Sequence, residues 1–189
     1  MKKVLIPLVF TLSGCAMSPQ QYDLTTTSAY PPIQSTKNIP EIKLKNIDYQ
    51  PPIGISPNTI SSTGCLPCHT DGSTPGFLFA EKISDIVKAE INNALKEVEL
   101  SSQKSSCTLN AIIHSAKFNV MTGNTNVDIT YTLSNKEQDI FKKRIDGFHD
   151  HSLFSLQKVN RMLAFASRDS VTQLVTNNDF LNIVNSQCK

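Results

Sequence analysis

The stretch CTLNAIIHSAKFNVMTGNTNVDITYTLSN, residues 107–135, contains the clearest strand pattern of the chain and decides its fold class. Its second half alternates apolar and polar side chains, which is the pattern of a strand with one buried face. The apolar positions of that half are Val127, Ile129, Tyr131 and Leu133. Thr122-Gly123-Asn124, between the halves, has the composition of a turn. The stretch therefore predicts an antiparallel hairpin.

The first half of this hairpin changes its buried face midway. Apolar residues occupy odd positions at first and even positions later: Leu109, Ala111 and Ile113, then Ala116, Phe118 and Val120. One extra residue in a strand has this effect, because neighbouring side chains point to opposite faces. We therefore predict a β-bulge in this strand, with His114 as a half-exposed strand residue.

A long amphipathic helix is predicted upstream, over TPGFLFAEKISDIVKAEINNALKEVEL, residues 74–100. Its apolar side chains recur at helical spacing: Phe79, Ile83, Ile86, Val87, Ile91, Ala94 and Val98. Thr74 is the expected cap and Pro75 the expected first helical residue. Such a stripe is typical of core packing rather than of a cofactor groove.

Two weaker strand patterns lie at either end of this region. Ile42 and Leu44 alternate with Lys43 and Lys45, which predicts a strand with one buried face. The segment IFKKRIDGFH, residues 140–149, predicts a third and more polar strand after the hairpin.

A second helix is expected after Asn160 as its cap, and Asp179 is the expected cap of a short final helical turn. A sheet with helices on one face is the simplest way to bury both kinds of stripe. We therefore predict an α+β fold with a small, mostly antiparallel four-stranded sheet, two helices packed on one face, and a flexible tether before it.

The N-terminus MKKVLIPLVFTLSGC has two lysines, an apolar run and small residues before Cys15, in the order of a secretory signal. It resembles the lipobox of bacterial lipoproteins, which implies cleavage before Cys15 and acylation of that cysteine. By the same resemblance, Ala16 rather than Asp at the next position favours the outer membrane over the inner one. The alternative is an ordinary signal with an accidental cysteine. The expected organisation is a signal peptide over 1–14, a lipidated flexible tether over 15–40, and a periplasmic domain over 41–189 that contains a disulfide-bonded loop over 53–76.

Composition narrows the classes of partner. The chain has 18 basic and 16 acidic residues, and two of the basic residues lie in the signal, so the mature chain is near neutral. A neutral chain without tryptophan is not expected to bind nucleic acid. No later stretch is long and apolar enough to predict a transmembrane helix.

The motif Cys65-Leu66-Pro67-Cys68-His69 has the spacing that attaches haem c, with His69 as an iron ligand. Small cytochromes place a helix before the first cysteine, whereas ISPNTISSTG here is loop-like. Zinc is an alternative, with His149 or His151 as a further ligand, and so is a redox dithiol. An oxidising periplasm disfavours free thiolates.

Disulfide bonding is the favoured interpretation of the four cysteines that follow Cys15. They are Cys65, Cys68, Cys107 and Cys188. Four cysteines allow three connectivities. We favour Cys65–Cys68 together with Cys107–Cys188.

One more polar cluster is a candidate metal or acid–base site: Asp146, His149, Asp150 and His151. A solvated loop before the last helix is the favoured interpretation, because no nucleophile or orienting third group accompanies the cluster.

The whole pattern resembles small Gram-negative outer-membrane lipoproteins of the YajG type and the auxiliary lipoproteins of ABC-type transport systems. The resemblance rests on the lipobox, the helix FLFAEKISDIVKAEINNALKE, the hairpin around GNTNVDITYTL and the closing helix with its DFLNIV tail. It implies a periplasmic α+β domain that binds partners and has no catalytic residues. The loop with Cys65 and Cys68 departs from that pattern.

The expected function is therefore that of a non-enzymatic lipoprotein, anchored in the outer membrane and facing the periplasm. It would act as an assembly, accessory or binding factor for another envelope protein, without a cofactor. One alternative is a c-type haem electron-transfer lipoprotein that uses Cys65, Cys68 and His69. Another is a lipid- or small-ligand-binding auxiliary component of a transport system.

Overall fold

The computed structural model describes residues 40–63, 76–100, 105–136, 138–150 and 159–188. Several predicted features lie outside these residues: the signal peptide, Cys15, the tether, Thr74, Pro75, the motif from Cys65 to His69, and His151. The elements in chain order are β1 (Lys43–Tyr49), β2 (Thr59–Thr63), β3 (Gly76–Leu78), α1 (Ile83–Glu97), β4 (Cys107–Asn119), β5 (Thr125–Asn135), β6 (Gln138–His149), α2 (Val159–Val175) and α3 (Asn178–Gln187).

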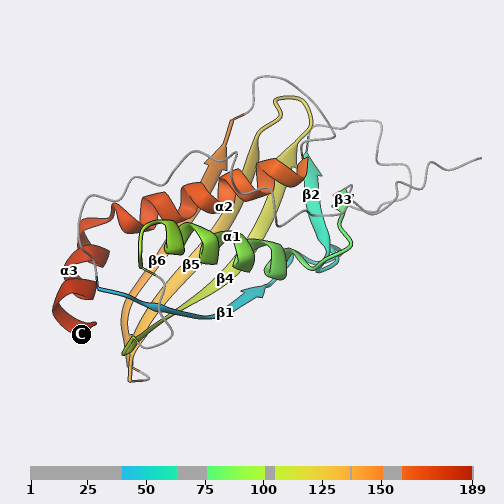
Figure 1. Ribbon diagram of the computed structural model, residues 1–189. Helices are drawn as coiled ribbons and strands as arrows, with labels where there is room; N and C mark the ends of the chain where they lie inside the picture. The colour runs from blue at the N-terminus through green and yellow to red at the C-terminus, as the bar shows by residue number, and fades with distance from the viewer. Residues whose placement is uncertain (1–39, 64–75, 101–104, 137, 151–158, 189) are drawn as a thin grey trace, which may run out of the picture.

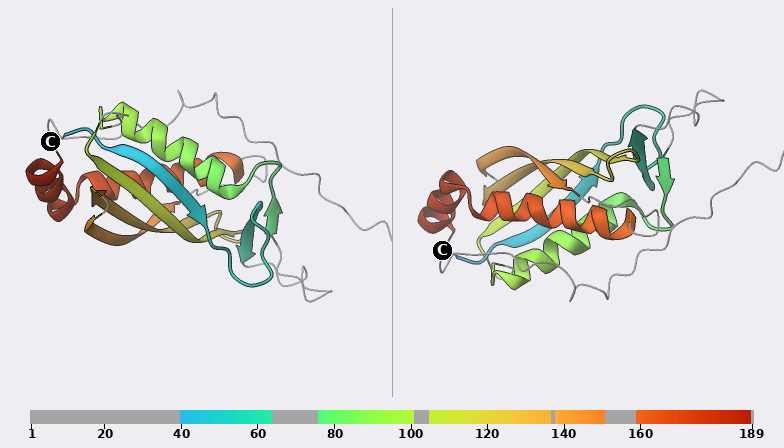
Figure 2. Two further views of the ribbon diagram at one scale, coloured as in Figure 1. Left: turned by 90° about the horizontal axis from the view of Figure 1, so that it is seen from below. Right: turned by 90° about the horizontal axis from the view of Figure 1, so that it is seen from above.

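The fold is α+β, as predicted, with one mixed sheet and helices on one of its faces (Figures 1 and 2). The sheet has six strands in the order β3-β2-β4-β5-β6, with β1 also paired to β4. The prediction of four strands and two helices was wrong in detail. Strand β2 falls within the segment 53–76 that was expected to be irregular, β3 begins at its last residue and runs into the stretch expected to be helical, and α3 is a separate helix.

Strands β1 and β2 lie end to end along one edge of β4, and both run parallel to it. β1 pairs with Thr108–Ile113, and β2 pairs with Lys117–Asn119. In the sequence, α1 comes after β1 and β2 and before β4. This helical connection lets β4 run in the same direction as β1 and β2. Among the described strands, the pairings β2–β3, β4–β5 and β5–β6 are antiparallel.

The predicted hairpin and its bulge are confirmed. β4 pairs with β5 along its length, and the register shifts between Ile113 and Ser115. Gly123 in the connecting turn has a φ of 77°, a conformation that glycine adopts without strain. The buried face of β4 changes at this bulge from Ile113 to Ala116.

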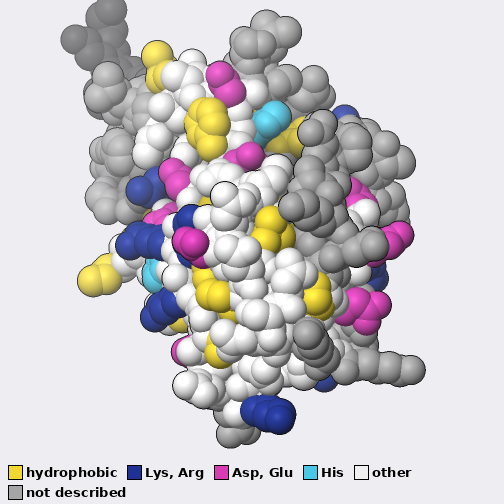
Figure 3. Space-filling view, turned by 90° about the vertical axis from the view of Figure 1, so that its left-hand side faces the viewer, with side chains coloured by type: hydrophobic (Ala, Val, Ile, Leu, Met, Phe, Trp, Pro, Cys, Tyr) yellow, Lys and Arg dark blue, Asp and Glu magenta, His cyan; other side chains and the backbone are white. Residues whose placement is uncertain are grey.

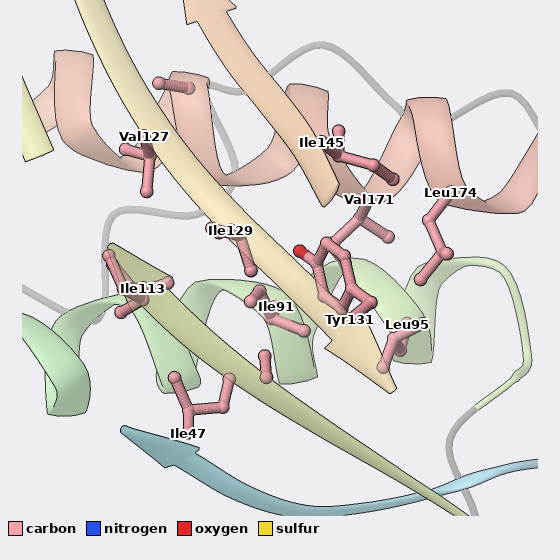
Figure 4. Close-up of a cluster of buried hydrophobic side chains, with 14 of the residues drawn as sticks. Ile47, Ile91, Leu95, Ile113, Val127, Ile129, Tyr131, Ile145, Val171 and Leu174 are labelled. Carbon is pink, nitrogen blue, oxygen red and sulfur yellow. The ribbon is translucent and has the colours of Figure 1, made fainter. Parts of the chain in front are cut away.

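The core lies between the sheet and the two long helices. Val127, Ile129, Tyr131 and Leu133 of β5 are fully buried, as the alternation predicted. The close-up in Figure 4 shows Tyr131 on the side of the sheet that faces Val171 and Leu174 of α2. The phenol of Tyr131 is 2.7 Å from Ser170 Oγ, and burial raises the pKa of this phenol well above its usual value. Tyr131 therefore stays neutral and joins β5 to α2.

The substitution Tyr131→Phe is expected to lower the free energy of unfolding by about 1 kcal/mol, because Ser170 loses one hydrogen-bond partner in a buried setting. Urea titration measures this change. Tyr49→Phe is the matched control, because Tyr49 is half-buried and its hydrogen bond to Thr59 O is longer, at 3.3 Å. An effect at Tyr49 as large as that at Tyr131 would contradict this interpretation.

The helix α1 begins at Ile83, eight residues after the expected start at Pro75. Gly76–Leu78 forms β3 instead, because it pairs with β2. Phe79 was assigned to the helical stripe; it is buried, but it lies before the helix. The other predicted stripe residues are buried in or directly after α1: Ile83, Ile86, Val87, Ile91, Ala94 and Val98.

The two predicted caps near the C-terminus were wrong. Asn160 lies inside α2, which already includes Val159. The cap of α3 is Asn177, whose side chain accepts a hydrogen bond from Phe180 N at 3.0 Å. Asp179 lies in the first turn of this helix, where an acidic side chain is favourable to the helix dipole.

A disulfide joins Cys107 at the start of β4 to Cys188 directly after α3, and this is the pairing that the sequence favoured. The bond ties the C-terminal helix to the sheet over a separation of 81 residues. Within the described residues, no helix has the length and apolar character needed to cross a bilayer.

Candidate functional site

The side of the sheet opposite the helices is polar, and we call it the open face. The side chains of β5 that point away from the core are Asn126, Asp128, Thr130 and Thr132. The two views of Figure 2 show α1 and α2 together on the other side of the sheet. An open-face pocket of about 520 Å³ is lined by Ser115, Lys117, Asn126, Asp128, Arg144 and Asp146.

Three neighbouring strands bring these six side chains together. The bulge in β4 leaves His114 as the extra residue and places Ser115 opposite Asp128. Across the other edge of β5, Asp128 pairs with Asp146. The pocket therefore exists only in this register of β4, β5 and β6.

The charges in the pocket are mostly paired with one another. Arg144 Nε donates to Asp128 Oδ1 at 2.8 Å, and Arg144 Nη2 donates to Oδ2 at 2.5 Å. Asn126 Nδ2 donates to Asp146 Oδ2 at 3.1 Å. The hydrogen bond from Arg144 holds the pKa of Asp128 below its usual value, which outweighs the opposing effect of partial burial; electrostatic interactions with Arg144, His114 and Lys117 also lower this pKa.

Lys117 and His114 are the remaining basic side chains at this pocket. Lys117 is exposed, and among the described residues it has no ion-pair partner. His114 is half-buried and its Nε2 lies 2.8 Å from Thr130 Oγ1, which agrees with its prediction as a half-exposed strand residue. The pocket thus has two positive and two negative side chains, of which Arg144 and Asp128 form an ion pair.

The substitution Asp128→Asn is expected to change stability only slightly at neutral pH, because exposed ion pairs contribute little. The lowered pKa means that the folded state binds a proton less readily than the unfolded state. The contribution of Asp128 is therefore present above about pH 4 and is lost as the pH falls further. Urea titrations at neutral and acid pH measure it: the difference between wild type and variant should shrink at acid pH, and a constant difference would contradict the assignment.

Among the described residues, four large apolar side chains are exposed: Ile53, Leu78, Met121 and Phe148. Phe148 lies two residues after Asp146 on β6, and Leu78 lies on β3, where it pairs with Thr59 of β2. The side chains of Phe148 and Leu78 are each 43% exposed. Ile53, in the connection between β1 and β2, is fully exposed. Figure 3 shows the side of the molecule that lies on the left of Figure 1, where basic and acidic side chains lie side by side.

The cluster considered as a metal or acid–base site is not assembled in the part of the chain that the structure describes. Asp146 lines the open-face pocket, whereas His149 is the last residue of β6 rather than a loop residue, and its ring stacks on Phe165 with centroids 4.4 Å apart. Among the described residues, no three His, Cys, Asp or Glu side chains are grouped to hold a metal ion.

Of the pocket residues, only Asp146 was considered from the sequence. The alternation of β5 already placed Asn126 and Asp128 on the polar side of their strand. Their approach to Lys117 and Arg144 depends on strand register, which the sequence pattern alone does not define.

No protein-family model and no curated protein matches the chain. A solved structure of a Xanthomonas campestris protein, described as a member of family DUF330, has a TM-score of 0.54 at 12% identity, over 90% of this chain and 97% of that one. An uncharacterized protein gives 0.52 at 10% identity, over 84% and 97% of the chains. The PelC dodecamer of Paraburkholderia phytofirmans gives 0.34 at 12% identity, over 72% and 94%. The first two likenesses show a shared fold.

Proposed function

We propose that this chain is a non-catalytic lipoprotein, anchored in the outer membrane through Cys15, that binds another protein of the cell envelope from the periplasmic side. The observation that supports this role best is the open face, where polar and charged side chains of β4, β5 and β6 line one pocket. A lipid anchor and a tether would hold such a domain near its partner.

The alternatives rest on different features. Carriage of a lipid or small apolar ligand is typical of an enclosed apolar cavity, whereas the open-face pocket is polar and lined by charged residues. Electron transfer through haem c rests on Cys65, Cys68 and His69, which lie outside the described residues. We therefore favour protein binding.

The anchor is tested by expressing the whole chain in a Gram-negative host with labelled palmitate. The wild-type chain should incorporate the label and fractionate with the outer membrane. The variant Cys15→Ser should do neither. Labelling of both proteins, or of neither, would contradict the assignment of Cys15.

The binding role is tested by chemical crosslinking in intact cells that express the anchored chain. A discrete adduct with another envelope protein is expected, and its identity follows from mass spectrometry of the gel band. A chain that forms no adduct under conditions that crosslink known envelope complexes would contradict the role.

A further inference from the structure

The strand β6 forms one edge of the sheet, and its outer side is only partly covered. It is the last strand in the order of the sheet, and among the described strands it pairs with β5 alone (Figure 1). In an antiparallel pair, alternate residues direct both backbone groups either to the neighbouring strand or away from it. Two hydrogen bonds to α2 show which residues of β6 point away. Phe148 N donates to Asp169 Oδ2 at 2.9 Å, and Asp146 O accepts from Gln173 Nε2 at 2.9 Å.

The same alternation continues along β6 toward its hairpin with β5. The pairing is regular from His149 back to Phe141, so the backbone groups of Arg144 and Lys142 also point away from β5. Side chains of α2 cover this edge near Asp146. No residue that the structure describes forms a hydrogen bond with the outward N–H and C=O groups of Lys142 and Arg144. These groups are therefore open to pairing with a further strand.

The open part of β6 carries an excess of positive charge. Lys142, Lys143 and Arg144 are consecutive and exposed, and no acidic residue occurs from Ile140 to Ile145. Arg144 is paired with Asp128, whereas neither lysine belongs to an ion pair within the described residues. The charges of the two lysines are therefore not compensated by an ion pair.

The acidic residues of β6 lie on either side of this open part. Asp139 accepts a hydrogen bond from Ser134 Oγ at 2.7 Å, and Asp146 accepts one from Asn126 Nδ2 at 3.1 Å. Directly across β5, Lys142 is opposite Thr132 and Lys143 is opposite Tyr131. Neither lysine thus has an acidic residue opposite it on the neighbouring strand.

The positions of the lysines distinguish the kinds of strand that this edge could accept. Lys142 and Lys143 are neighbours in a strand, so their side chains point to opposite faces of the sheet. An added strand alternates in the same way, so two consecutive acidic residues would each meet one lysine.

A second copy of the chain is a poor match for this edge. The strand β1, on the other side of the sheet, contains Lys43 and Lys45. Pairing of β6 with β6 or β1 of another copy would bring lysines close to one another, which is unfavourable. A bilayer surface offers negative charge but no row of backbone groups for the edge to pair with.

We propose that the outer edge of β6 at Lys142–Arg144 binds an extended acidic segment of another envelope protein, which pairs with this edge as an additional strand. This inference rests on the proposed function, because it names the surface and the chemistry through which the partner is bound. Backbone hydrogen bonds hold the segment in place whatever its sequence, and the two lysines select a segment with consecutive acidic residues.

The experiment uses the whole lipidated chain in cells, with a photocrosslinking phenylalanine analogue at Gln138, an exposed residue at the start of β6. A single adduct with another envelope protein is expected, and its crosslinked peptide should contain consecutive acidic residues. Lys142→Pro removes an outward N–H together with one charge. The double variant Lys142→Glu, Lys143→Glu reverses both charges. Each of these two variants should lower the adduct yield about tenfold, the loss typical of contact residues.

The matched control reverses the charges at the other edge of the sheet. Lys43→Glu, Lys45→Glu on β1 should leave the yield unchanged. Proline is tolerated in an edge strand where its nitrogen faces solvent, so Lys142→Pro should unfold at nearly the temperature of the wild type. Lys143→Pro should unfold at a lower temperature, because the N–H of Lys143 points toward β5. If Lys142→Pro is itself unstable, the charge-reversal variant still tests the inference.

Other outcomes overturn the inference. An adduct whose yield is unchanged in both variants would leave the binding role intact but exclude strand addition at this edge. An adduct with twice the mass of the chain would identify a second copy as the occupant, and an adduct with lipid alone would identify the bilayer. No adduct from Gln138, in cells where chemical crosslinking still joins the chain to an envelope protein, would place that partner elsewhere. The absence of adducts by both methods would contradict the proposed function as well.

Discussion

Replacing Gly147 by alanine should lower the free energy of unfolding by about 3 kcal/mol. Gly147 lies on β6 where this strand meets α2, and a Cβ there would lie 2.1 Å from Ala166 O and 2.8 Å from Ser170 Cβ. The first of these atoms belongs to the helix backbone, so no side-chain rotation can relieve the contact. The strand or the helix has to shift, which disturbs the packing around Tyr131. Urea titration of the purified domain measures the loss.

Gly54→Ala is the matched control for this prediction. A Cβ at Gly54 would meet no atom within 4 Å, but the φ of 87° is unfavourable for alanine. The expected loss is about 1 kcal/mol, from backbone strain alone. Equal losses at Gly54 and Gly147 would show that the close approach of β6 to α2 is not what makes glycine necessary at position 147.

The second large effect is expected when the disulfide between Cys107 and Cys188 is removed. The double variant Cys107→Ala, Cys188→Ala should lose about 2–5 kcal/mol, because the bond closes a long loop in the unfolded chain. The bond also holds the end of α3 against the sheet, where Asn135 Nδ2 donates to Gln187 O at 2.6 Å. Amide hydrogens of α3 should therefore exchange faster in the variant, whereas those of β5 should change less.

The variant Cys65→Ser, Cys68→Ser is the control for that experiment. It leaves the bond between Cys107 and Cys188 intact, and the ring that it removes is expected to be short, so its effect on stability should be smaller. Wild-type protein unfolded in urea with a reductant should approach the stability of the Cys107, Cys188 variant. A double variant as stable as the oxidised wild type would contradict the structural role of this bond.

Local sequence patterns were sufficient to predict those elements in which one face is buried, because burial determines the spacing of the apolar residues. The hairpin of β4 and β5 and the bulge near His114 follow from the spacing of apolar residues, because each strand has one face in the core. The stripe of α1 follows in the same way. These parts of the fold could be predicted because each pattern runs over many residues. An uncertainty of a few residues at its ends therefore does not change the type of element that is predicted.

Long-range pairing was not predictable from these patterns. β2 and β3 have five and three residues, too few to establish a period, and they form because they pair with each other and β2 with β4. The start of α1 was misplaced for the same reason, since Gly76–Leu78 pairs as a strand. The open-face pocket depends on the register of β4, β5 and β6. The proximity of Lys117, Asp128 and Arg144 could therefore be seen only in the structure.

The central claim is that the mature chain is an anchored, disulfide-bonded binding module without a covalent cofactor. The most direct test is the intact mass of the full-length protein, purified from the membranes of a Gram-negative host that also expresses the haem-maturation machinery. The account predicts a chain that begins at an acylated Cys15, with a mass lower by two hydrogens for each disulfide and no visible chromophore. A mass increased by covalent haem, together with a Soret absorption band, would contradict it and make His69 an iron ligand.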